Sequence, residues 1–344
     1  MSRRHDPDIA GVVVVDKPAG MTSHDVVGEV RRALGMRRVG HTGTLDPAAT
    51  GVLVCAVGRA TRLVPVLQAG RKTYAATAVF GVETDSQDAD GTVIAEADAS
   101  HLTEHAICEV MTRFIGPLEQ VPPMVSAVKV GGRRLHELAR EGIEVERDAR
   151  HVTIHDLVME DWEPGAHPLV SFLVTCSAGT YIRTLAHDIG AELGVGGSLV
   201  ALRRVANGPF VLEQAMTMDE VRAAGRDHAL RARLLSPAAA TAHLPRIPVG
   251  VELALRMAHG QRVPLDELAH EPLSEDPVAV VDPDDALVGI FTPGQGVLQP
   301  DVVMARPEDY LAAARAPGTS DAATAPAGTS ASPTSGRGLE SSDG

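Results

Sequence analysis

The chain has 344 residues, of which 44% are hydrophobic, so it is long enough for one large domain and a smaller one. Its longest apolar runs, at residues 12–15 and 52–57, are far shorter than the roughly 20 residues of a membrane-spanning helix. Residues 1–10 lack the apolar core of a secretory signal. We therefore expect a soluble, cytoplasmic protein with no membrane span.

Cysteine usage and charge limit the possible ligands. Cys55, Cys108 and Cys176 are odd in number and widely spaced, so neither a disulfide framework nor a metal site is predicted. A net charge of −14 argues against nucleic acid as a partner. However, residues 1–74 hold 11 Lys and Arg against 6 Asp and Glu. On charge alone, a basic RNA-binding face and an ordinary solvated face are equally compatible with the sequence.

The first predicted elements are a buried strand at residues 11–15 and a helix that begins after Thr22 and runs to about Leu34. The helix is indicated by apolar side chains at Val26, Val27 and Val30. The later elements, in chain order, are strands at 51–57 and 74–81, a helix at 104–115, a strand at 126–130 that turns at Gly131-Gly132, strands at 151–160 and 169–177, and a helix at 180–193 before Gly194.

This mixture of strands and helices has no strict βαβ rhythm, so the sequence predicts an α+β domain around a mixed sheet. Beyond Leu244 the chain changes to short strands broken by Pro and Gly, at 278–281 and 287–291, which predicts a small β-rich domain. Residues 316–344 consist almost entirely of small and polar residues, and a disordered tail is expected there.

The most informative segment is GHTGTLDPAATG at residues 40–51, a glycine-punctuated loop that presents one carboxylate, Asp46, between small residues. Such a loop can bring its backbone close to a ligand. The ordinary interpretation of an Asp-Pro pair makes Asp46 the cap of a helix that begins at Pro47. The surrounding sequence favours the functional interpretation.

The segment resembles the catalytic motif of the TruB family of tRNA pseudouridine synthases, and five more regions resemble that family in the same order. Upstream, GVVVVDKPAGMTS at 11–23 is similar to the Lys-Pro motif. The downstream matches are KTY at 72–74 and GVETDSQDADG at 81–91, PPMVSAVK at 122–129 for an RNA-gripping insertion, and CSAGTYIRTL at 176–185 for the last catalytic motif.

The resemblance implies a pseudouridine-synthase-like mixed β-sheet core with flanking helices in residues 1–243, with an RNA-gripping insertion at about 120–150. Residues 244–306 would form a small PUA-like β-rich domain, and 316–344 the tail. The implied isomerase acts on uridine 55 in the T loop of tRNA: it breaks the glycosidic bond, rotates the base and rejoins it through C5. This reaction adds no group, so no cofactor is expected.

The resemblance gives Asp46 the role of catalytic carboxylate. Whether it attacks the sugar, attacks the base or removes a sugar proton is left open. Tyr74, which could otherwise be a packed strand tyrosine, would stack on the flipped uracil with its hydroxyl near the departing C5 proton. Arg183, otherwise a surface arginine, would pair with Asp46 and keep it ionised.

The remaining implied contacts are with bound RNA. Tyr181 would be a second pocket tyrosine, Leu202 would contact the base through its backbone, and His41 would contact the extruded nucleotide, unless it is simply a buried histidine. The tRNA T arm is the expected partner and no nucleotide cofactor is expected; a monomer is implied, although the residues do not fix the oligomeric state. The candidate phosphate ligands are Arg37, Arg38, Arg59, Lys72, Lys129, Arg133 and Arg134.

One position departs from the family pattern: His136 stands where relatives commonly place Tyr. Three other classes of protein fit the sequence less well. A non-catalytic RNA-binding protein would not need Asp46, Tyr74 and Arg183 intact. A glycoside hydrolase would need a second carboxylate, and none shares the Asp46 loop. Nucleotide-dependent chemistry is disfavoured because no Gly-Lys-Ser/Thr loop or GxGxxG segment occurs.

Overall fold

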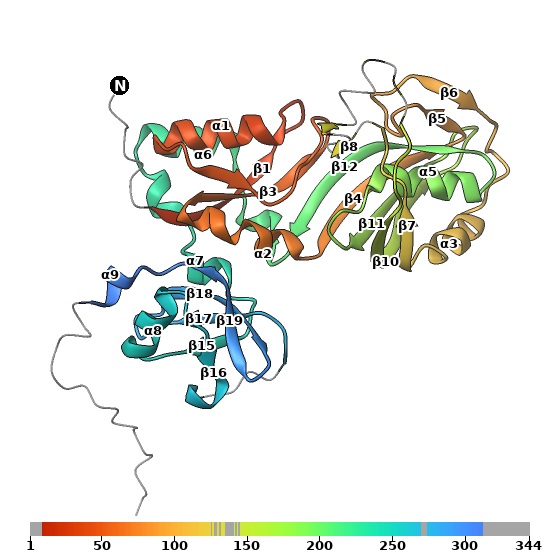
Figure 1. The fold of residues 1–344 in the computed structure, drawn as a ribbon. Helices are drawn as coiled ribbons and strands as arrows, with labels where there is room; N and C mark the ends of the chain where they lie inside the picture. The colour runs from red at the N-terminus through yellow and green to blue at the C-terminus, as the bar shows by residue number, and fades with distance from the viewer. Residues whose placement is uncertain are drawn as a thin grey trace, which may run out of the picture.

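The computed structural model describes residues 9–124, 126, 129–130, 132–134, 141, 143, 145–269 and 274–311. A ten-stranded mixed sheet runs through the larger part, and a five-stranded sheet forms the C-terminal part (Figure 1). No helix within these residues is long and apolar enough to cross a membrane. The predicted α+β class with a mixed sheet and a β-rich C-terminal region is confirmed.

The large sheet is continuous because β12 (Gly197–Asn207) pairs along its length with β4 and, near its end, with β3 (Figure 1). The pairing with β4 is antiparallel and that with β3 is parallel. The strand order is β14 (Met216–Thr217), β1 (Ala10–Lys17), β3 (Thr50–Gly58), β12, β4 (Lys72–Phe80), β11 (Leu169–Cys176), β10 (Arg150–Glu163) and β7 (Gly116–Gln120), while β2 (Val39–His41) pairs with β3 and β13 (Phe210–Val211) with β12.

Helices cover the two halves of the sheet separately. In the first half, α1 (Ser23–Leu34) lies beside α6 (Met218–Arg226) (Figure 1). The Thr22 side chain caps α1 in a capping box with Asp25, and Gly35 ends it at φ 64°. The other elements of the larger part, in both halves, are η1 (Arg59–Leu63), α2 (Val64–Ala69), the hairpin of β5 (Val82–Thr84) and β6 (Val93–Glu96), α3 (Glu104–Thr112), the hairpin of β8 (Lys129–Val130) and β9 (Arg133–Arg134), α5 (Ile182–Glu192), η2 (Leu212–Gln214), η3 (Leu230–Arg233) and α7 (Pro237–Ala240).

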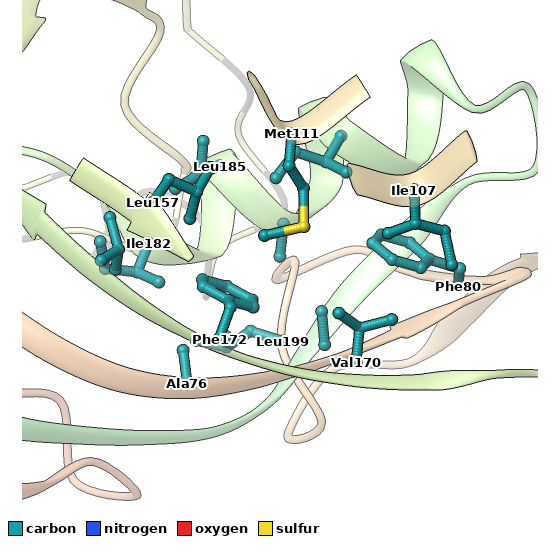
Figure 2. Close-up of a cluster of buried hydrophobic side chains, with 14 of the residues drawn as sticks. Ala76, Phe80, Ile107, Met111, Leu157, Val170, Phe172, Ile182, Leu185 and Leu199 are labelled. Atoms are coloured by element: carbon teal, nitrogen blue, oxygen red, sulfur yellow. The ribbon is translucent and has the colours of Figure 1, made fainter. Parts of the chain in front are cut away.

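The core of the second half lies between the sheet and helices α3 and α5 (Figure 2). Alternate residues of β4 and β11 face this core, including Ala76 and Phe172, while α5 contributes Ile182 and Leu185. Such a two-residue period is what a strand with one buried face requires. Leu45 and Tyr74 belong to the same cluster. The predicted catalytic loop therefore rests directly on a packed core.

The C-terminal part packs against the first half of the large sheet. Its strands are β15 (Arg246–Pro248), β16 (Val263–Pro264), β17 (Val278–Val281), β18 (Leu287–Gly294) and β19 (Val297–Val303), with η4 (Leu265–Glu267) and helices α8 (Val251–Ala258) and α9 (Pro307–Tyr310). Val281 and Ile290 share an apolar cluster with Val12 of β1. Arg59 and Arg62 donate to the carbonyl oxygens of Met304 and Val303 across this contact.

Most predicted elements occur where they were expected, and the Asp46 loop does not follow the ordinary interpretation of an Asp-Pro pair. No helix begins at Pro47: residues 44–49 form an irregular loop, and only the Ala49 amide donates back to the Asp46 carbonyl. The predicted helix at 104–115 ends earlier, at Thr112. His136, Gly131 and the tail at 316–344 lie outside the described residues.

Gly51 allows β3 to approach β12. Its φ is +102°, and a Cβ at this position would lie 2.2 Å from the Arg204 carbonyl oxygen. We expect Gly51→Ala to lower the free energy of unfolding by at least about 2 kcal/mol, measured by urea titration. The control is Gly20→Ala, where φ is +81° and nothing lies within 4 Å. An equal loss in both variants would show that strain at positive φ, and not the contact with β12, accounts for the effect.

Candidate functional site

An open cavity of about 360 Å³ lies between the Asp46 loop, β4, β12 and the start of α5. Its walls include six residues that were candidates from the sequence: Asp46, Lys72, Tyr74, Tyr181, Arg183 and Leu202. These residues come from four separate segments of the chain. The structure therefore brings the main predicted site residues together in one place.

Arg183 is the electrostatic centre of the site. Its Nη2 lies 3.1 Å from Asp46 Oδ2, and its Nη1 lies 3.0 Å from Asp88 Oδ2. The arginine side chain is buried, whereas 48% of the Asp46 side chain is exposed. A guanidinium can bridge two carboxylates because its donors form a planar fork. The Asp46 carboxylate is therefore oriented while one side of it stays open to a ligand.

The two segments that carry Arg183 and Asp88 are fixed by their own contacts. The buried Gln120 side chain accepts from the Tyr181 amide at 2.9 Å and donates to the Tyr181 carbonyl at 3.2 Å, just before Arg183. Asp88 lies in a loop that is joined to β12 because Ala89 donates to the Leu199 carbonyl. A second cavity, of about 410 Å³, lies between this acidic loop and β12 and shares Asp46 and Arg183 with the first.

The Asp46 loop is held from three directions. Ser23, at the start of α1, exchanges hydrogen bonds with both the amide and the carbonyl of Leu45. Lys17 donates to the Pro47 carbonyl at 3.1 Å, and Arg204 donates to the Gly43 carbonyl at 3.2 Å. The Pro47 carbonyl, which a helix would have used, is instead taken by the buried Lys17 ammonium. This explains why the Asp-Pro pair does not start a helix.

Burial controls the ionisation of several groups around the cavity. It lowers the pKa of the Lys17 ammonium to about 8, although the nearby Asp46 carboxylate opposes this, and it lowers the pKa of Lys72 to about 8 as well. Burial raises the pKa of the Tyr74 hydroxyl, while the neighbouring Arg204 acts in the opposite direction. Tyr74 is therefore a neutral phenol near pH 7.

His41 lies beside the site and outside the cavity wall. It ends β2, accepts from the Gly43 amide through Nδ1 at 3.3 Å, and meets His24 edge to face at 5.6 Å between ring centroids. Burial lowers the pKa of His41, and the adjacent His24 adds to this effect. The histidine pair flanks the loop that carries Asp46.

The candidate phosphate ligands are distributed unevenly. Arg37, Arg38 and Arg133 are exposed. Two others lie elsewhere than expected: Arg59 is turned toward the Met304 carbonyl of the C-terminal part, and Lys72 is buried in the cavity wall with its ammonium on the Gln68 and Gly70 carbonyls. Nothing is described for the side chains of Lys129 and Arg134.

Sequence reasoning did not select several residues of the site. Asp88 stands in the quoted 81–91 motif and Lys17 in the 11–23 motif, but neither was given a role. Arg204 and the exposed Arg150 line the cavity, and Gln120 orients Tyr181. In the described part of the chain, no group of three or more His, Cys, Asp or Glu is arranged to hold a metal ion.

Comparison with known proteins identifies the family. Residues 31–182 match the N-terminal domain of the TruB family of pseudouridylate synthases, and residues 183–241 match the C-terminal domain of tRNA pseudouridylate synthase B. The tRNA pseudouridine synthase B of Symbiobacterium thermophilum is 56% identical over 253 residues, which cover 74% of this chain and 83% of the relative. The chain belongs to the TruB family. The resemblance seen in the motifs is thus confirmed.

Other TruB-family relatives and solved structures extend the match. The synthase of Thermobifida fusca is 45% identical and aligns over 86% of this chain and 98% of its own length. A chain of a Cbf5-Nop10-Gar1 complex superposes with a TM-score of 0.67 at 29% identity, covering 87% of this chain and 86% of that one. A chain of an H/ACA RNP bound to a substrate RNA that contains 2′-deoxyuridine superposes with a TM-score of 0.66 at 25% identity. The match covers 89% of this chain and 93% of that one.

The lowered pKa of Lys72 predicts a pH dependence of stability. Below about pH 8 both the folded and the unfolded state hold the proton, and the folded state bears the cost of burial. Between about 8 and the ordinary value of 10.5, the unfolded state binds more protons, so the free energy of unfolding rises with pH.

The measurement is urea unfolding of the native chain and of Lys72→Met at pH 7 to 9.5. The difference between the two free energies of unfolding should grow in favour of the native chain above pH 8, by at most about 1.4 kcal/mol per pH unit. A difference that stays constant across this range would contradict a lowered pKa for Lys72.

Proposed function

We propose that this chain converts uridine 55 in the T loop of tRNA to pseudouridine, with Asp46 as the catalytic carboxylate. The observation that carries the assignment is the Asp46–Arg183 pair at 3.1 Å in the wall of a cavity that also contains Tyr74. An ionised carboxylate, half-exposed and held by a buried guanidinium, is suited to act on a ribose carbon or its proton.

The reaction is balanced without any external group. The N1–C1′ bond breaks, and its electron pair stays with N1. Asp46 either bonds to C1′ or takes the proton from C2′, so its negative charge is consumed as the base becomes a monoanion. The base then rotates, and C5 bonds to C1′. The C5 proton leaves to solvent, and N1 takes up a proton. Asp46 is released as a carboxylate, either because C5 displaces it from C1′ or because it returns the proton to C2′.

Tyr74 and Leu202 would hold the base during this rotation. Tyr74 is buried beside the cavity and presents a flat face against which a pyrimidine can stack. A neutral phenol is a poor base, so removal of the C5 proton through Tyr74 requires a neighbour that favours the phenolate. Arg204 is that neighbour, because it lies close enough to oppose the rise in the Tyr74 pKa.

The RNA would contact exposed basic residues, including Arg150 in the cavity wall and Arg37, Arg38 and Arg133 elsewhere on the surface. We assign residues 1–243 to the catalytic domain, with the insertion at about 120–150, and residues 244–306 to a small C-terminal domain. The T arm is recognised by its shape, and one chain suffices.

A glycoside hydrolase fits the site less well. The second carboxylate near Asp46 is Asp88, and both accept from the same guanidinium. A glycosidase needs one carboxyl group that carries a proton for the leaving group. The direct test of the proposed activity is incubation with an unmodified tRNA transcript, followed by carbodiimide mapping. A stop at uridine 55 is expected, and the lack of a stop at every uridine would contradict the proposal.

Replacement of Asp46 by Asn should abolish turnover because the amide can neither attack C1′ nor accept a proton. The affinity for tRNA should stay within several-fold, since phosphate contacts supply most of the binding. The measurement is single-turnover pseudouridine formation together with filter binding. Residual activity above a few per cent would remove Asp46 from the reaction.

Tyr74→Phe keeps the stacking surface and removes the hydroxyl. Binding should be unchanged, while the rate at which the C5 proton leaves should fall by at least about 100-fold. Tritium release from tRNA labelled at C5 measures this step. If the release is as fast as in the native chain, Tyr74 only packs against the base.

A further inference from the structure

Positive charge is concentrated at the candidate site and buried there. Among the lysines and arginines whose burial the structure describes, four are buried: Lys17, Lys72, Arg183 and Arg204. Three of them line the cavity, and Lys17 donates to the Pro47 carbonyl next to Asp46. This occurs in a chain with a net charge of −14.

The buried cations differ in their partners. Arg183 faces two carboxylates. Arg204 instead donates to the carbonyl oxygens of Val52, Thr44 and Gly43 at 2.7, 3.4 and 3.2 Å. The Lys72 ammonium donates to two carbonyl oxygens, at 2.8 and 2.9 Å. Within the described chain, no carboxylate forms an ion pair with Arg204 or Lys72.

These two charges approach each other at the inner wall of the cavity. A Cβ built on Gly43 would lie 3.7 Å from Lys72 Cε and 3.8 Å from Arg204 Nη1, so both side chains border the same glycine. Arg204 also adds to the fall in the pKa of Lys72 that burial causes. Burying a cation without a carboxylate is costly, which suggests a site built for an anion that arrives later.

We propose that Arg204 and Lys72 stabilise the uracil anion released when the N1–C1′ bond breaks. This inference rests on the proposed reaction of Asp46 with the sugar, because either route leaves the electron pair of that bond on N1. The anion is delocalised over N1 and the carbonyl oxygens of the base. Fixed positive charge in the cavity wall lowers the energy of such a leaving group without solvent reorganisation.

The geometry favours the base over an RNA phosphate as the anion. Arg204 is only 1% exposed and lies beside the Tyr74 hydroxyl, at the depth to which a stacked base would reach. Phosphates stay on the outside of an extruded nucleotide, where the exposed Arg150 lines the cavity. The two sources predict different results, since a lost phosphate contact weakens binding and reduces its salt dependence.

The test compares leaving groups. Two tRNA transcripts are used, with uridine or 5-fluorouridine at the target position, because fluorine acidifies the base and makes its anion a better leaving group. The readout is the single-turnover loss of the N-linked nucleoside from nuclease digests. Arg204→Gln should slow the reaction of uridine by at least about 100-fold. The ratio of the fluorouridine rate to the uridine rate should rise at least tenfold over that of the native chain.

Matched variants separate charge from loop support. Arg204→Lys keeps the charge and should retain more of the rate than Arg204→Gln, which keeps only one donor group. Lys72→Met should show the same rise in the rate ratio, and it carries the test if Arg204→Gln does not fold. An unchanged ratio of the fluorouridine rate to the uridine rate in both variants would overturn the proposal. A loss of tRNA affinity together with a weaker dependence of that affinity on salt concentration would overturn it as well.

The control is Asp46→Asn on both transcripts. If it cleaves at the native rate, the assignment of Asp46 fails, and this result is distinct from an unchanged leaving-group ratio in the Arg204 and Lys72 variants. If Asp46→Asn is inactive and the rate ratio is unchanged in the Arg204 and Lys72 variants, the proposed function stands and only the role of the two cations is rejected.

Discussion

One buried guanidinium determines the arrangement of the site. Arg183 lies at the start of α5 and holds Asp46 on one side and Asp88 on the other. Removing a guanidinium from water costs several kcal/mol, and the cost is offset only while both carboxylates stay in place. The surrounding contacts serve that geometry: Gln120 fixes the backbone before Arg183, and the bond from Ala89 to Leu199 fixes the Asp88 loop on β12.

The same constraint explains the division of charge in this acidic chain. Two carboxylates are matched by Arg183, while Arg204 and Lys72 are held by carbonyl oxygens alone. The cavity wall therefore has an excess of positive charge, although most of the chain is acidic. Because β12 carries Arg204 and also joins the two halves of the sheet, the strand that completes the fold also supplies this charge.

The sequence predicted those features that depend on local pattern. The helix after Thr22 follows from its cap and from the spacing of Val26, Val27 and Val30, and all four features are present. The convergence of Asp46, Tyr74 and Arg183 followed from ordered motifs. The ordinary rule for an Asp-Pro pair does not apply at Pro47, because Lys17 takes the Pro47 carbonyl that a helix would have used.

The sequence could not predict the contacts that depend on how distant segments of the chain pair in the fold. Arg203 and Arg204 are neighbours, and only the pairing of β12 with β3 and β4 buries one and leaves the other to bond with Asp16. Arg59 reaches Met304, 245 residues away, so no local pattern could distinguish it from a phosphate ligand. Asp88 was inside a recognised motif, but its role depends on where the loop meets α5.

The central claim is that Arg183 orients Asp46 for the reaction and contributes little to RNA binding. It is tested most directly by single-turnover tritium release from C5-labelled tRNA with Arg183→Met, whose folding is checked by circular dichroism and Tm. We predict a rate at least about 100-fold below that of the native chain, with tRNA affinity within several-fold. A folded variant with the native rate, or one whose loss lies entirely in affinity, would contradict the account.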